Sequence, residues 1–66
     1  MIEFNEIAPL DKLRFKMGNL ECIVIDIENG TRINTGLITI AYFSKSLNKY
    51  EVCSIPDYSL YYYEKM

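Results

Sequence analysis

The amino-acid sequence predicts an all-β fold: a small closed barrel of five short strands, with one turn of 3₁₀ helix before the last strand. Three observations lead to this prediction. Apolar and polar residues alternate with a period of two from Lys12 onward, β-branched and aromatic residues fill these segments, and Gly, Asn or Pro separates them. Closure into a barrel removes the exposed edges that a flat sheet of this size presents.

The first strand is predicted over residues 12–17. Leu13, Phe15 and Met17 alternate there with three basic residues, which is typical of a strand with one face on a core and the other in water. A turn at Gly18-Asn19 follows and leads into the second strand.

The second strand, over residues 21–28, is expected to be the most central. We expect its isoleucines at positions 23, 25 and 27 to face the core, with Ile25 in the middle of that face. The opposite face then holds Cys22, Val24, Asp26 and Glu28. If replacing Ile25 by alanine leaves stability unchanged, this assignment is wrong, and Cys22 and Val24 have to point inward instead.

Asn29-Gly30 is a strong hairpin signal, because both residues tolerate the positive φ of a type I′ turn. Two arrangements remain open. Either this pair forms a tight turn with Thr31 pairing back at once, or residues 29–36 form a loop at the tip. We expect a hairpin interrupted by a bulge at residues 34–36, since a glycine before a strong strand is a common place for one.

The remaining elements complete a barrel over residues 11–66, preceded by an N-terminal arm over residues 1–10. Two strands, over residues 37–43 and 49–55, are joined by a polar turn at residues 44–48. A short 3₁₀ segment begins at a proline and covers residues 56–60, and the last strand covers residues 61–64.

Charge argues against a protein that gathers duplex phosphates. Seven Lys and Arg residues against nine Asp and Glu residues give a net charge of −2, so nucleic acid is a disfavoured partner. Lys12, Arg14 and Lys16 are expected to form one solvated face rather than a basic patch with Arg32. No apolar run is long enough for a membrane span, and an acidic N-terminus is atypical of a signal peptide, so a cytoplasmic location is expected.

Catalytic chemistry is not expected. The sequence has no His to serve as base for a Ser or Cys nucleophile. Cys22 and Cys53 have apolar neighbours and are expected to be core thiols, without a disulfide. No metal-ligand spacing, phosphate-binding loop or dinucleotide motif occurs, so neither a metal nor another cofactor is predicted.

Tyrosine is the unusual component, with six residues in the chain. Those near the C-terminus fit the role of covering a small core, with Leu60 and Tyr62 inward and Tyr61 and Tyr63 half exposed. A protein-binding patch is the second possibility. The third is a groove that stacks single-stranded bases or holds a methylated cation.

A resemblance to a known family supports the predicted barrel. The succession of strand patterns and the closing Pro56-Asp57-Tyr58-Ser59-Leu60 resemble the small bacterial YodC-like proteins, which are SH3-like barrels, and more loosely KOW and Tudor barrels. The resemblance covers residues 10–64 and implies an SH3-like barrel. That family has no known active site, so it implies no functional residues.

The functional hypothesis is therefore a small non-enzymatic binding module, an adaptor or an inhibitor, with a protein as its partner. One version is an inhibitor encoded by a phage or mobile element and directed at a host nucleic-acid enzyme. The alternative is a single-stranded nucleic-acid-binding barrel of the KOW or Tudor type. We expect the contact surface at the loops of residues 18–19 and 44–48, together with Tyr42, Tyr50 and Tyr58. The oligomeric state is left open.

Overall fold

The computed structural model describes residues 2–66 and has five antiparallel strands in one sheet, in the order β4-β3-β2-β1-β5. The elements in chain order are η1 (Phe4–Glu6), β1 (Lys12–Phe15), β2 (Leu20–Glu28), β3 (Leu37–Ser44), β4 (Lys49–Pro56), η2 (Asp57–Tyr62) and β5 (Tyr63–Lys65). The all-β class and the 3₁₀ turn before the last strand are confirmed. Closure of the barrel stays a prediction, because no ladder joins β4 to β5 within residues 2–66.

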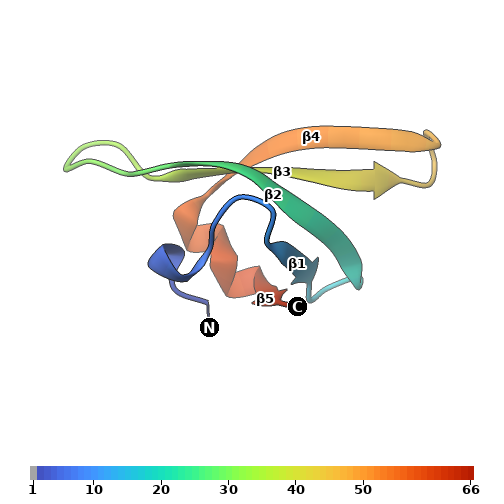
Figure 1. Cartoon of the computed structure of the whole chain (residues 1–66), viewed down its shortest axis with the longest axis horizontal. Helices are drawn as coiled ribbons and strands as arrows, with labels where there is room; N and C mark the ends of the chain where they lie inside the picture. The colour runs from blue at the N-terminus through green and yellow to red at the C-terminus, as the bar shows by residue number, and fades with distance from the viewer. Residues whose placement is uncertain (1) are drawn as a thin grey trace.

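The sheet is sharply bent, so that it wraps around its own core. Figure 1 shows β3 and β4 as an extended hairpin along the long axis, with β1, β5 and η2 on the other side of β2. The turn at residues 45–48 and the loop at residues 29–36 lie at opposite ends of that axis. The extents of 38 × 20 × 19 Å reflect the length of this hairpin.

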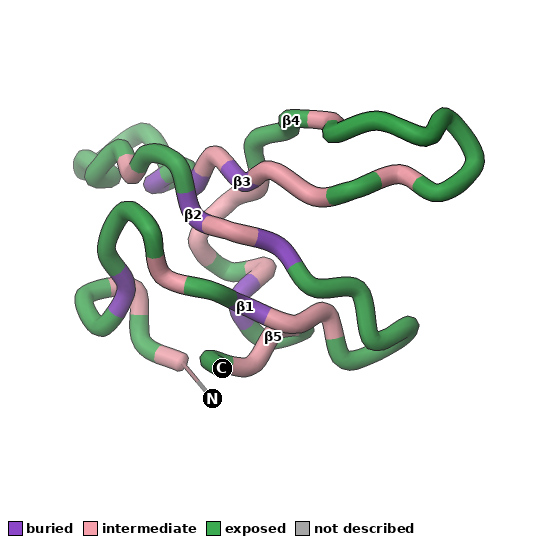
Figure 2. The backbone as a smooth tube through the Cα atoms, turned by 45° about the vertical axis from the view of Figure 1, so that its right-hand side comes forward, coloured by how far each residue is buried: buried purple, intermediate pink, exposed green. Residues whose placement is uncertain are grey.

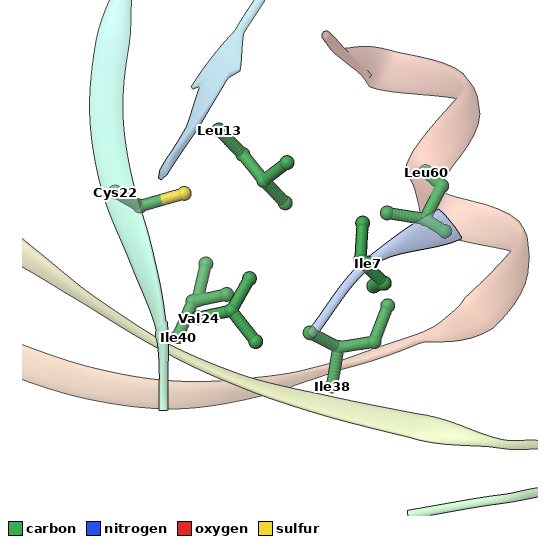
Figure 3. Packing of buried hydrophobic residues seen from close by; sticks show 7 residues of the cluster. All are labelled: Ile7, Leu13, Cys22, Val24, Ile38, Ile40 and Leu60. Atoms are coloured by element: carbon green, nitrogen blue, oxygen red, sulfur yellow. The ribbon is translucent and has the colours of Figure 1, made fainter. Parts of the chain in front are cut away.

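The core is one small cluster on the inner face of the bend. It takes residues from the three strands β1, β2 and β3, from the segment before β1 and from η2 (Figure 3). Its members are Ile7, Leu13, Cys22, Val24, Ile38, Ile40 and Leu60. Burial of these apolar side chains is the main force that holds the sheet in its bent shape.

The predicted N-terminal arm packs against the sheet. Ile7 is buried in the core, and Phe4 of η1 packs against the cluster. The chain then pairs with β2, where the Leu10 amide donates to the Val24 carbonyl at 2.7 Å. Met1, at the start of that arm, lies outside the described residues.

The expected inward face of β2 is wrong for Ile23 and Ile25, whereas Ile27 packs against the core as expected. Val24 is fully buried and Cys22 nearly so, whereas Ile25 is 45% exposed. The cause is a β-bulge: Val24 pairs with Ile40, but Asp26 pairs with Thr39, so Ile25 has no partner of its own. The extra residue reverses the alternation, and β2 presents even-numbered residues to the core before the bulge and Ile27 after it.

The favoured arrangement of the second hairpin is also wrong. β2 ends at Glu28 and β3 begins at Leu37, so residues 29–36 form a loop, the other arrangement considered. Gly30 does not take a positive φ there. A Cβ on Gly30 would lie 2.7 Å from the Gly36 amide nitrogen, so this glycine permits the two ends of the loop to approach closely.

Three side chains that were expected to face the core are exposed. Met17 is 73% exposed, because β1 ends at Phe15 and the chain turns at residues 16–19. Cys53 is exposed although it pairs with the buried Ile40, because β4 is an edge strand of the sheet. The 3₁₀ helix continues through Tyr62, so Tyr62 is exposed, and Tyr63 is the tyrosine that packs against the cluster.

Candidate binding surface

The predicted tyrosines Tyr42, Tyr50 and Tyr58 do not share one surface. Tyr42 pairs with Cys22 and packs against the core from the inner face. On β4, Tyr42 pairs with Glu51, and Tyr50 is the adjacent residue. It therefore points to the opposite, outer face, where it is 70% exposed. Tyr58 lies in η2 and lines a depression with the loop at residues 29–36, at the other end of the molecule.

An apolar patch covers the outer face of the sheet over β2, β3 and β4. Cross-strand pairs on one face of a sheet lie side by side, and here Ile23 pairs with Ala41, and Ala41 with Val52. The next outer pair is Phe43 with Tyr50. We call these five residues, Ile23, Ala41, Phe43, Tyr50 and Val52, the outer patch.

Aromatic packing orders one end of the outer patch. The rings of Phe43 and Tyr50 lie 5.2 Å apart at 70°, an edge-to-face arrangement that fixes both side chains on the surface. Tyr50 is 70% exposed, Val52 60% and Phe43 40%. A contacting molecule therefore meets apolar side chains that are already ordered.

A polar rim borders the outer patch on the β1 side. Lys12 and Glu21 line a shallow depression of about 330 Å³ together with Ile23, Phe43 and Tyr50. Arg14, also on this side, is paired with Glu64, and its Nε donates to Oε1 at 2.9 Å. An apolar centre with a charged rim is the arrangement found in protein–protein interfaces.

The two loops predicted as part of the contact surface lie together beside this patch. Residues 18–20 and 44–46 line one depression of about 400 Å³, and Phe43 belongs to it as well. The hairpin turns that precede β2 and β4 are positioned by Asn19 and Asn48, which both take φ 53°. Asparagine tolerates this left-handed conformation better than most residues, which explains its position at the end of each turn.

A second exposed aromatic group lies on η2. The rings of Tyr61 and Tyr62 lie 5.3 Å apart, nearly perpendicular. The Lys16 ammonium lies 5.8 Å from the centre of the Tyr61 ring and donates to the Tyr61 carbonyl at 3.2 Å. Tyr61 thus already contacts Tyr62 and Lys16 within the chain. Lys16 belongs to this cluster rather than to a basic patch.

The ionisable groups with shifted pKa values lie in the core. Burial raises the pKa of the Cys22 thiol, Cys53 raises it further, and a hydrogen bond with the Leu13 backbone partly opposes this. Burial also raises the pKa of the Tyr63 hydroxyl, with smaller contributions from Cys22 and its neighbours. A thiol with a raised pKa is protonated at neutral pH and is a poor nucleophile. Among residues 2–66 no three His, Cys, Asp or Glu side chains are grouped so as to hold a metal ion.

Comparisons with protein-family models, with curated proteins and with solved structures found no match. The resemblance to YodC-like proteins therefore stays a prediction. In the described part of the chain, no helix has the length and apolar character that crossing a bilayer requires.

Sequence reasoning named Tyr50 and the adjoining loops as part of a contact surface but did not name the other residues of the outer patch. A signal was present: Tyr50 and Val52 alternate with Lys49, Glu51 and Cys53. It shows two apolar residues on one face of β4. It does not show that this face lies away from the core.

Proposed function

We propose that the protein is a small non-enzymatic binding module, an adaptor or an inhibitor, that contacts another protein through the outer patch. The observation that carries the proposal is an ordered apolar surface, Phe43, Tyr50 and Val52, that is left exposed beside a charged rim. Exposed apolar patches rimmed by polar residues mark interaction sites, and tyrosine is enriched among the residues that dominate binding energy.

The net charge of −2 supports a protein rather than a nucleic acid as the partner. Two of the basic residues of the expected solvated face already have partners, Arg14 with Glu64 and Lys16 with Tyr61. The local positive charge available for phosphates is correspondingly small.

The experiment compares two matched double variants in affinity capture from the native host, followed by mass spectrometry. Tyr50→Ser/Val52→Ser changes the outer patch, whereas Tyr61→Ser/Tyr62→Ser changes two exposed aromatics on η2. Circular dichroism establishes that each variant is folded. Loss of one interface tyrosine typically costs about 1 to 3 kcal/mol, so the patch variant should bind the captured protein about a hundredfold more weakly.

Salt separates the two functional classes. Binding to a protein through an apolar patch should change little between low and moderate salt, whereas binding to single-stranded nucleic acid should weaken steeply. A folded patch variant that keeps the parental affinity, or a complex that dissociates as salt rises, would overturn the proposal.

A further inference from the structure

The two edges of the sheet are protected very differently. β5 is three residues long and carries charged side chains, with Glu64 paired to Arg14 and the Lys65 ammonium 3.5 Å from an Asp11 carboxylate oxygen. β4 is eight residues long, and within the described chain it pairs only with β3. Figure 2 shows it exposed over most of its length.

A free edge of this kind is a template for another strand, because one row of its N–H and C=O groups is unpaired. Natural sheets protect long edges with charges, prolines or short strands. Between Tyr50 and Ile55 the only charged residue in β4 is Glu51, and its only proline is the last residue, Pro56. Only an extended segment can pair with this edge, and a second copy of β4 presents an edge of the same length, with no proline before its last residue.

We propose that β4 pairs antiparallel with β4 of a second copy of this chain, with Val52 on the two-fold axis. Such an axis is perpendicular to the sheet, and residues that pair across it point to the same face of the sheet. Adjacent residues of a strand point to opposite faces, so the residue at the axis must pair with its own equivalent in the second copy. The middle of β4 falls between Val52 and Cys53. Those two residues are therefore the candidates for the axis.

Pro56 decides between them. With Val52 on the axis, the new ladder runs from Lys49 to Ile55 and leaves Pro56 outside it. With Cys53 on the axis, Pro56 is drawn into the ladder opposite Tyr50, where it has no N–H to donate. The Val52 register also places no two like charges opposite each other, since Glu51 meets Cys53 of the second copy.

Pairing in this register joins the outer patches of the two copies. Val52 meets its own equivalent, and each is flanked by Ala41 on β3. Tyr50 meets Ser54 of the second copy, so the two aromatic pairs lie on either side of the axis. The inference does not rest on the proposed function, because it concerns the edge of β4 and not a contact made by the outer face.

The first test measures the mass of the full chain by sedimentation equilibrium, in the presence of reductant, from about 10 µM to about 1 mM. We expect twice 7.7 kDa at high concentration and a return to the monomer on dilution. Val52→Lys puts two ammonium groups on the axis and should weaken association at least about tenfold. Ile33→Lys, the same kind of change at a loop residue that is 90% exposed, should leave association unchanged.

The second test uses a nearly isosteric change, so it does not depend on how well the lysine variant folds. In Val52→Cys/Cys53→Ser, the introduced thiols of two copies face each other across the axis. Diamide accepts the two hydrogens as these thiols form a disulfide. This variant should cross-link into a dimer much faster than the parent chain, whose Cys53 meets Glu51.

Three results would overturn the inference. The first is a parent chain that remains a monomer at the highest concentration. The second is equal association of the two lysine variants. The third is a parent chain that cross-links through Cys53 as fast as the double variant. A monomer that still captures a protein through the outer patch would refute the dimer and leave the proposed function intact.

Discussion

Replacing Val24 by alanine should cost more stability than replacing its neighbour Ile25, although the valine loses fewer atoms. Val24 is fully buried beside the bulge, and Val24→Ala removes two methyl groups from the core. At about 0.8 kcal/mol for each buried methyl group, the lost transfer free energy lowers the free energy of unfolding by about 1.6 kcal/mol. The cavity left in a well-packed core adds to this, so the expected loss is about 2 to 3 kcal/mol.

Ile25→Ala removes three carbons, but Ile25 is the unpaired residue of the bulge and is 45% exposed. Only about half of the transfer free energy applies, and solvent fills the space that is left. The expected loss is about 1 kcal/mol.

Thermal melts followed by circular dichroism, with urea titrations, measure both variants against the parent. At about 4 to 8 °C per kcal/mol for a domain of this size, Val24→Ala should melt about 10 to 20 °C below the parent and Ile25→Ala about 4 to 8 °C below it. A larger loss for Ile25→Ala than for Val24→Ala would refute the bulge and the inward face derived from it.

Leu10 takes a φ of 80° and is 78% exposed, so Leu10→Gly should raise stability by about 1 kcal/mol in urea, whereas Asn48→Gly should change it by only a few tenths. Equal effects of the two changes would argue against strain at Leu10. Cys22→Ser should lower the melting temperature clearly because it buries a hydroxyl, and Cys53→Ser on exposed β4 should not. The raised pKa values of Cys22 and Tyr63 mean that the folded chain holds these protons more tightly than the unfolded chain. Their contribution to stability is complete below the ordinary thiol pKa and is lost as the pH rises through the raised values, so urea midpoints should fall from about pH 9 upward and fall less in Cys22→Ser/Tyr63→Phe.

The strands and their order along the chain were accessible to sequence reasoning because they depend on local properties. β3 and β4 contain β-branched and aromatic residues, and Asn19 and Asn48 mark the turns before β2 and β4. The 3₁₀ segment follows Pro56, which ends β4 because proline lacks the donor that the ladder needs.

The inward faces were less accessible, because they depend on partners that are distant in sequence. Cys22 and Val24 are as apolar as Ile23 and Ile25, so only the pairing of β2 with β3 reveals the bulge at Ile25. Asn29-Gly30 has the composition of a tight turn, but residues 29–36 form a loop in which Gly30 lies close to Gly36, a contact that the local sequence does not reveal. The outer patch depends on the bend of the sheet, which covers the inner side of β3 and leaves Phe43, Tyr50 and Val52 in solvent.

Site-specific photo-cross-linking in cells of the native host tests the central claim most directly. The photoreactive amino acid p-benzoylphenylalanine replaces Tyr50 in one variant and Tyr61 in the other; both tyrosines are exposed, at 70% and 62%. If the outer patch is the binding surface, irradiation should attach a second protein at position 50 and not at position 61, while an adduct of twice 7.7 kDa reports the β4 dimer instead. Adducts at position 61 alone, or no adduct with another protein at position 50, would contradict the account.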